Sequence, residues 1–176
     1  MNFSELTWKR KSIRSFKPDE IPMEKIIKLL DAARSAPSAG NRQPWYFYVI
    51  KDNDLKKELY RSAYSQKFML GAPIYIVVCA DLERTAIRYG ERGVNLYAIQ
   101  DTAAAIENLL LCATEEGLAA CWCGAFDEKE VTVILNLDEQ MRPVAIIPVG
   151  YAENEQSPKT GRRQLEDITT FIGFKE

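Results

Sequence analysis

The chain has 176 residues, of which 47% are hydrophobic and 27% are charged, and its formal net charge is -2. This length suits one domain that buries about two thirds of its unfolded surface, so we expect a single domain over residues 1–176. The small net charge argues against nucleic acid or a membrane surface as a partner. The chain has no histidine, which excludes Ser-His and Cys-His catalysis and histidine-ligated metals, and we expect no metal site.

The first part of the chain predicts two helices, a turn and a strand. A short helix is expected over residues 4–9, and Pro22 suits the first turn of a second helix that runs to about Ser35. Pro37 ends that helix. The aromatic run "WYFYVI", residues 45–50, then predicts a strand.

The rest of the chain alternates between helix and strand without a regular βαβ fingerprint, which favours an α+β fold. The expected elements are a helix over 53–64, a buried strand "IYIVVCA" over 74–80, a helix or loop over 82–93, a helix over 95–116 that Gly117 ends, a strand "LAACWCGAF" over 118–126, a helix from Asp127 to about Leu135, a strand "PVAIIPVGY" over 143–151, a polar arm over 152–163 and a terminal amphipathic segment.

The helix predicted over residues 95–116 has almost no polar face. A helix that is apolar nearly all round belongs in the core, in a subunit interface, or in both. We favour both, and therefore a homodimer.

The four cysteines lie in apolar runs, no signal-peptide pattern opens the chain, and no apolar run is long enough to span a bilayer. We therefore expect a cytoplasmic protein with reduced thiols. A disulfide between Cys121 and Cys123 would be strained, since positions i and i+2 share one strand face, so core thiols are favoured over a redox pair. Gly124 allows a ligand to approach the backbone closely.

Two polar stretches are candidates for chemistry. In "APSAGNRQPW" the prolines and Gly40 define a turn, and Ser38, Asn41 and Gln43 offer amide and hydroxyl groups that suit a heteroaromatic rim; an ordinary loop is the alternative. "KRKSIR" is either a solvated helix end or an anion pocket built from side chains, since no glycine-rich phosphate loop is present. A second basic group consists of Lys159, Arg162 and Arg163.

Taken together, these stretches resemble the nitroreductase family of FMN-dependent oxidoreductases. The matching stretches, in chain order, are "RKSIRSF", "AARSAPSAGNRQPWYFYVI", "AP" at residues 72–73, "QDTAAAIENLLLCATEEGL", "CWCGAF", "IIPVGY" and the closing basic arm. The resemblance implies a three-layer α+β sandwich, in which helices flank a mostly antiparallel central sheet. It also implies an intertwined homodimer with FMN at the subunit interface.

The resemblance further assigns the FMN contacts. The phosphate and polar ring atoms would be held by Arg10, Lys11, Ser12, Arg14, Arg162 and Arg163. The partner subunit would line the ring with Pro37, Ser38, Ala39, Asn41 and Gln43. The main chain near Cys123 and Gly124 would approach the reactive edge of the flavin, with Gln66 as a further contact. Cys123 stands where some relatives carry a glutamate.

The implied activity is transfer of hydride from NADH or NADPH through N5 of FMN to nitroaromatic, quinone or similar acceptors by a ping-pong mechanism, with no catalytic side chain. Residues 60–70 and 82–95 would shape the acceptor pocket. The alternatives are a related flavoenzyme that performs dehalogenation, flavin fragmentation or heterocycle oxidation, and a flavin-binding protein without catalysis.

Overall fold

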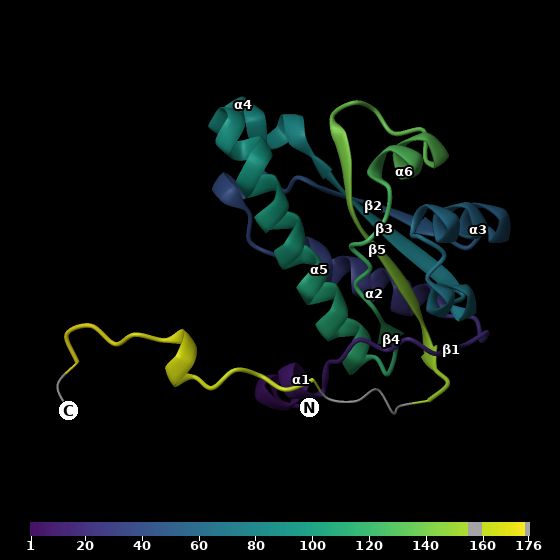
Figure 1. Cartoon of the computed structure of the whole chain (residues 1–176), viewed down its shortest axis with the longest axis horizontal. Coiled ribbons are helices and arrows are strands. Elements are labelled where there is room, and N and C mark those ends of the chain that lie inside the picture. Colours follow the sequence, from purple (N-terminus) through teal and green to yellow (C-terminus); the bar gives the residue numbers. More distant parts are fainter. Residues whose placement is uncertain (155–159, 175–176) are drawn as a thin grey trace.

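The computed structural model describes residues 1–154 and 160–174 of the chain (Figure 1). Its helices are α1 (Phe3–Lys9), α2 (Met23–Arg34), α3 (Asn53–Ser62), α4 (Leu82–Arg92), α5 (Ala98–Glu115) and α6 (Glu128–Ile134). Its strands are β1 (Phe16–Lys17), β2 (Trp45–Ile50), β3 (Ile74–Asp81), β4 (Ala119–Ala120) and β5 (Met141–Ala152). Short helical turns add η1 (Ala39–Asn41), η2 (Lys67–Gly71), η3 (Gly93–Tyr97) and η4 (Glu166–Ile168).

The strands form one antiparallel sheet in the order β1-β5-β3-β2, and β4 also pairs with β5. β3 is central, because Val77 lies opposite Ile146 of β5 on one side and opposite Tyr48 of β2 on the other. Seven of its eight residues are buried, as its continuous apolar run predicted.

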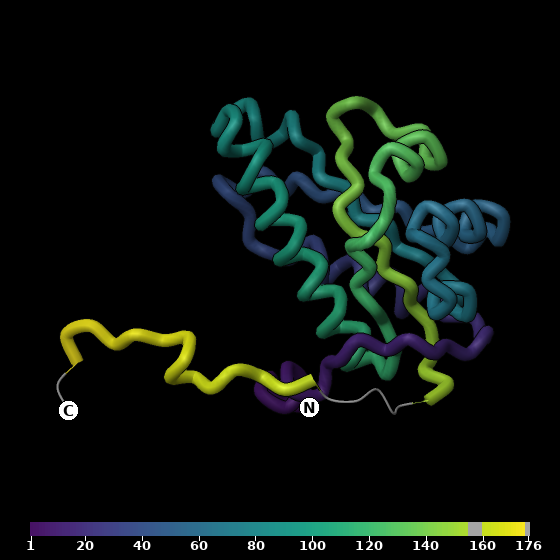
Figure 2. Tube along the Cα trace, viewed as in Figure 1, coloured from purple at the N-terminus to yellow at the C-terminus, as the bar shows by residue number. Residues whose placement is uncertain are grey.

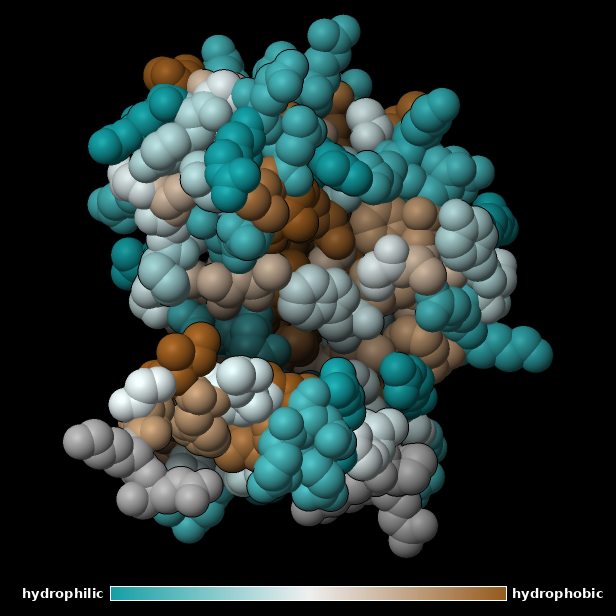
Figure 3. Space-filling view, turned by 60° about the vertical axis from the view of Figure 1, so that its left-hand side comes forward, coloured by the Kyte–Doolittle hydropathy of each residue, from teal (hydrophilic) through white to brown (hydrophobic). Residues whose placement is uncertain are grey.

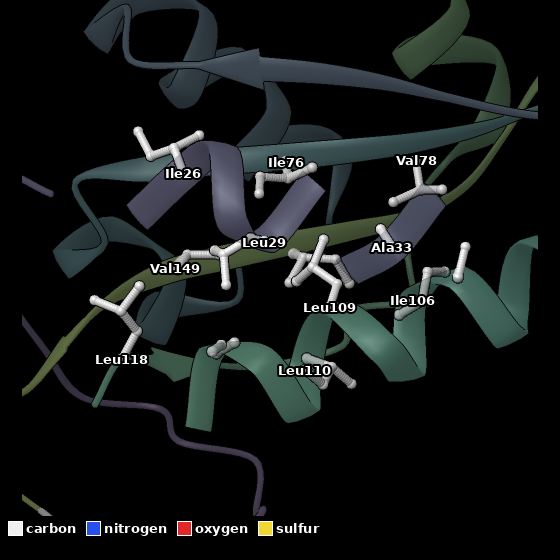
Figure 4. Close-up of a cluster of buried hydrophobic side chains, with 14 of the residues drawn as sticks. Ile26, Leu29, Ala33, Ile76, Val78, Ile106, Leu109, Leu110, Leu118 and Val149 are labelled. Carbon is white, nitrogen blue, oxygen red and sulfur yellow. The ribbon is translucent and has the colours of Figure 1, made fainter. Parts of the chain in front are cut away.

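Alternate residues of β3 face two separate cores. Ile74, Ile76 and Val78 pack with α2 and α5, around Leu29 and Leu109 (Figure 4). Tyr75, Val77 and Cys79 pack on the opposite face with Leu59 of α3 and Val131 of α6. The sheet is therefore the middle layer between two helical layers, which confirms the predicted three-layer α+β sandwich.

The long helix α5 is buried along one side and half-buried along much of the rest. Eight of its residues are buried, including Ile106 and Leu109, while Gln100 and Glu107 are exposed. It begins at Ala98, later than predicted, because residues 93–97 form a wider π-helical turn. No helix in the described part of the chain is long and apolar enough to cross a membrane.

The prediction of a strand over residues 118–126 is mostly wrong. Only Ala119–Ala120 pairs regularly with β5, and Cys123 adds an isolated bridge to Ile146. Between them, the backbone N–H of Cys121 donates to the carbonyl of Pro148 at 3.3 Å. Pro148 has no N–H to return a bond, so the ladder is interrupted there.

Three further differences have local causes. The helix predicted to Tyr64 ends at Ser62, because Tyr64 and Ser65 adopt φ of 54° and 53°. The short strand β1 was not predicted. The described part of the C-terminal segment, residues 160–174, forms only the turn η4 and projects away from the body (Figures 1 and 2).

Candidate functional site

The turn that follows α2 is a rigid, hydrogen-bonded structure. Gly40, Asn41 and Gln43 have φ of 54°, 55° and 51°, conformations that suit glycine and asparagine. The Ser38 hydroxyl accepts from the Gln43 backbone N–H at 2.9 Å. The Gln43 Nε2 donates to Asn41 Oδ1 at 3.1 Å. The three side chains that the sequence singled out therefore lie together, and each still has unused polar atoms.

Asp101 anchors this turn to the first part of α5. The backbone N–H of Ala39 lies 3.1 Å from both carboxylate oxygens of Asp101. Burial raises the pKa of Asp101, and the hydrogen bond from Ala39 opposes that rise. This role of Asp101 is not predictable from the sequence, in which its only signal is an acidic residue within a nearly apolar helix.

The helix α4 covers the same turn. The Arg42 Nε donates to the carbonyl of Arg84 at 2.6 Å, and the Arg84 Nε donates to the carbonyl of Arg42 at 3.0 Å. A Cβ on Gly40 would lie 2.5 Å from the Tyr89 hydroxyl and 2.9 Å from Nη1 of Arg88. A larger residue would displace these two side-chain ends and would also be strained at the φ of 54°.

The side chains of the basic segment after α1 have different partners, some on α5 and some at the Cys121 thiol. Arg10 forms an ion pair with Glu107 of α5, with 3.3 Å between Nε and Oε1. Ser12 and Arg14 interact with the Cys121 thiol, and these interactions oppose the rise in the pKa of Cys121 that burial causes. Lys11 instead lines a cavity of about 580 Å³ with Trp8 and Leu118. The four predicted phosphate contacts thus have different neighbours within this chain.

Arg14 begins a second polar surface, which we call the thiol face: Ser12, Arg14, Gln66, Cys121, Cys123 and Gly124. The Arg14 guanidinium lies 5.7 Å from the centre of the Phe68 ring. Nε2 of Gln66 lies 3.0 Å from Sγ of Cys123. Burial raises the pKa of Cys123, so its thiol stays neutral at physiological pH.

Gly124 is exposed, and the space beside it is open. A Cβ there would meet no atom closer than Nε1 of Trp122, at 3.8 Å. Packing within the chain therefore does not explain a glycine at this position, whereas close approach of a ligand to the backbone would.

The turn and the thiol face are separated within one chain. Asp101 of α5 holds the turn, and α5 packs on one side of the sheet. Cys123 of the thiol face packs on the other side, with Leu59 of α3 and Val131 of α6. Across the described residues, no hydrogen bond or ion pair joins the 38–43 turn to Arg10, Ser12 or Arg14.

The predicted C-terminal contacts lie on the projecting arm. Arg162 donates to the carbonyl of Thr160 at 3.1 Å, and Arg163 donates to the carbonyl of Asp167 at 2.7 Å. Both guanidinium groups therefore bond within their own arm. Lys159 lies outside the described residues.

The two surfaces have the chemistry that FMN requires. Amides at Asn41 and Gln43 match the mixed carbonyl and N–H edge of an isoalloxazine ring. Guanidinium groups match phosphate. The open flank of Gly124 leaves space for a flat ring against the backbone.

Comparison with known proteins agrees with this chemistry. The sequence pattern of the nitroreductase family matches residues 8–66 and 58–151. A protein of Archaeoglobus fulgidus, provisionally named NADH dehydrogenase/NAD(P)H nitroreductase, is 32% identical over 156 residues, which span 86% of this chain and 86% of that protein. The iodotyrosine deiodinase of Thermotoga neapolitana is 27% identical over 186 residues, which span 92% of this chain and 94% of that protein.

Solved structures share the fold. The crystal structure of a nitroreductase family protein from Clostridium difficile 630 superimposes with a TM-score of 0.84 at 31% sequence identity. The superposition covers 97% of this chain and 98% of that one. The similarity therefore includes the turn, the thiol face and the helices that hold them.

Proposed function

The chain belongs to the nitroreductase family, and on that premise we propose that it is an NAD(P)H-dependent FMN oxidoreductase that reduces nitroaromatic, quinone or similar acceptors. We propose that it acts as a single-domain, cytoplasmic homodimer. The observation that carries the proposal is the presence, on one chain, of two complementary polar surfaces: the turn, which α5 holds, and the thiol face, whose Cys123 packs on the opposite side of the sheet. A second copy would bring the turn of one subunit to the thiol face of the other.

The roles of the residues follow from their chemistry. Bound FMN supplies the hydride transfer chemistry, for which no histidine is needed. Asn41 and Gln43 would orient the edge of the ring, because each amide both donates and accepts. Arg14 and Ser12, with the arm residues Arg162 and Arg163, would neutralise and hold the phosphate.

Orientation and access would be the other contributions of the protein. The backbone at Gly124 leaves the ring accessible at one edge, and the neutral Cys123 thiol adds no charge there. Donor and acceptor would occupy the same open face in turn, which is the basis for a ping-pong mechanism. Positive charge near the ring would favour its reduced, anionic form.

The C-terminal arm supports the dimer. Leu165, Ile168, Phe171, Ile172 and Phe174 are each at least 58% exposed, and the arm projects from the body (Figure 1). Figure 3 shows this side of the molecule hollowed, with hydrophobic surface inside the hollow. Apolar surface of this kind is typical of an interface.

A second candidate keeps the fold and changes the reaction. The similarity to an iodotyrosine deiodinase favours reductive removal of a halogen from a halogenated phenol as the alternative activity. A flavin-binding protein without turnover is the remaining possibility. In that case NAD(P)H would reduce the bound flavin, and the flavin would pass its electrons to none of the acceptors.

One titration tests these proposals. The purified protein is loaded with FMN and titrated anaerobically with NADH and with NADPH, and then with a nitroaromatic, a quinone and a halogenated phenol. We expect loss of the flavin absorbance near 450 nm on addition of the donor and its recovery with the nitroaromatic or the quinone. Failure to bind FMN would contradict the proposal, and recovery with the halogenated phenol alone would favour dehalogenation.

A further inference from the structure

Arg42 of the 38–43 turn, Arg84 and Arg88, which contact that turn, and Arg92 on the same helix as these two have no carboxylate partner in the described part of the chain. We call them the arginine patch: Arg42, Arg84, Arg88 and Arg92. Among the described residues, the ion pairs involve other basic side chains and none of these four. Glu83 and Glu91 lie on the same helix, yet neither pairs with the patch. Asp101 and Asp81 accept backbone N–H groups of Ala39 and Arg84 and form no ion pair with the guanidinium groups. Like charges repel one another, and an anion bound between them relieves that repulsion.

The guanidinium groups are held in place with their donor ends free. Arg42 and Arg84 each use Nε to bond the other's carbonyl, at 2.6 Å and 3.0 Å. Their Nη1 and Nη2 atoms, which form the fork that binds carboxylate or phosphate, make no hydrogen bond within the described chain. The fork is therefore available to a ligand.

Aromatic rings fix the other two arginines. The Arg88 guanidinium lies 5.4 Å from the centre of the Tyr89 ring, and that of Arg92 lies 5.3 Å from the centre of the Tyr97 ring. Tyr89 and Tyr97 themselves stack edge to face, with 5.1 Å between ring centres. Such packing lowers the entropic cost of binding an anion.

The patch lies directly on the turn proposed to line the flavin. The Tyr89 hydroxyl and Nη1 of Arg88 occupy the space that a Cβ of Gly40 would need. Asn41 and Gln43 follow Gly40 in the same turn. A flat molecule stacked over the ring would thus reach Arg88 with a substituent at its edge.

We propose that the arginine patch binds an oxyanion carried by the flat aromatic co-substrate that docks on the flavin, and that Arg88 is the specificity-determining residue. This inference rests on the proposed function. Two sources share the chemistry. One is a carboxylate at the edge of the acceptor ring, and the other is the 2'-phosphate of NADPH, which the adenosine ribose carries beyond the nicotinamide that stacks on the flavin. Both offer paired oxygens that match the guanidinium fork.

The experiment compares charged with neutral co-substrates on the FMN-loaded enzyme. One arm measures the ratio of kcat/KM for 4-nitrobenzoate to that for 4-nitrobenzyl alcohol, with NADH as donor. The other arm measures the ratio of kcat/KM for NADPH to that for NADH, with benzoquinone as acceptor. The variants are Arg88→Gln, Arg88→Lys and, as a control for loss of one positive charge elsewhere, Lys129→Gln, which lies on the exposed face of α6.

We expect Arg88→Gln to lower one of the two ratios about tenfold, which corresponds to about 1.4 kcal/mol. A fall in the first ratio assigns the patch to an acceptor carboxylate, and a fall in the second assigns it to the 2'-phosphate. Arg88→Lys should recover part of the loss, because it retains the charge without the fork. The inference is overturned if both ratios stay at the wild-type values, or if Lys129→Gln lowers them equally. Reduction of the bound flavin by NADH tests the proposed function separately, because it does not depend on these ratios.

Discussion

Nε2 of Gln66 donates to Sγ of Cys123 and to the carbonyl of Ala125, each at 3.0 Å. One amide group therefore holds both sides of Gly124. The same nitrogen also lies 3.0 Å from the carbonyl of Ala63, so it is committed to its own chain. Gln66 is thus better described as a clamp on the loop than as a group free to bond the flavin through this nitrogen.

Replacement of Gln66 tests the clamp. We expect Gln66→Ala to lower FMN affinity about tenfold and to destabilise the fold by about 1 kcal/mol, because hydrogen bonds to the loop are lost. Gln66→Glu should be worse, since a carboxylate would face carbonyl oxygens. Fluorescence titration with FMN and urea unfolding provide the two measurements. Gln140→Ala, at an exposed glutamine, is the control, and unchanged FMN affinity in Gln66→Ala would refute the clamp.

Asn41 is predicted to bind flavin through its amide. We expect both Asn41→Ala and Asn41→Gly to weaken FMN binding about tenfold, the loss of one well-placed hydrogen-bonding group. The two variants separate binding from strain, because φ at Asn41 is 55°. Alanine pays about 1 kcal/mol in this conformation and glycine does not. FMN affinity is measured by fluorescence, and wild-type affinity in the glycine variant would contradict the assignment.

Gly124 is predicted to leave space for a ligand beside the backbone and to contribute little to the stability of the fold. A Cβ at this position meets nothing closer than 3.8 Å, so Gly124→Ala should change the free energy of unfolding by less than about 0.5 kcal/mol. FMN affinity should fall, because the new methyl group occupies the space beside the backbone. Gly150→Ala is a useful contrast, since its Cβ would lie 2.7 Å from Cδ of Pro73. It should destabilise the protein, and a Gly124→Ala variant that binds FMN normally would count against the close approach.

Asp101 makes the stability of the turn dependent on pH. Burial raises its pKa above the ordinary value of 3.8, so the folded protein binds this proton more tightly than the unfolded chain. The stabilising contribution is present below the unfolded pKa and is lost as pH rises through the folded pKa. Asp101→Asn does not titrate, so its stability relative to the wild type should improve between pH 3.8 and neutrality. Urea unfolding at pH 4 and pH 7 measures this, and a difference that is independent of pH would be the contrary result.

Local patterns predicted the elements that carry most of the core. The strands over 45–50, 74–80 and 143–151 are present, because these short apolar runs are rich in β-branched and aromatic residues and are bounded by turn residues. The helix after Pro22 is present because its apolar residues recur at helical spacing. The strand signal was misleading over 118–126. The residues over 118–126 alternate as a strand requires. The partner strand, however, has Pro148 at a position where a backbone N–H is needed to return a hydrogen bond. The sequence of 118–126 alone does not show that this N–H is missing from its neighbour.

The candidate site was predictable in its residue types and less so in its arrangement. The turn at Ser38, Asn41 and Gln43 was identified from its polar side chains and its breakers of regular structure. Asp101 and Arg88 were not assigned roles, because both lie on helices whose sequence gives no sign that they reach this turn. The sequence also does not predict the hydrogen bond from the Gln66 amide to Cys123, since the two residues are 57 positions apart.

The sequence by itself determined the α+β class, the buried strands, the family and the dependence of any activity on something other than histidine. These follow from composition, periodicity and the order of short motifs, which need no knowledge of distant contacts. Only the tertiary structure decided that the turn is held by α5 while Cys123 of the thiol face packs on the other side of the sheet, and that the arginines of the patch form no ion pair with any described residue. Both arrangements depend on the direction in which each side chain points from its helix or loop, and contacts between residues far apart in the sequence set that direction.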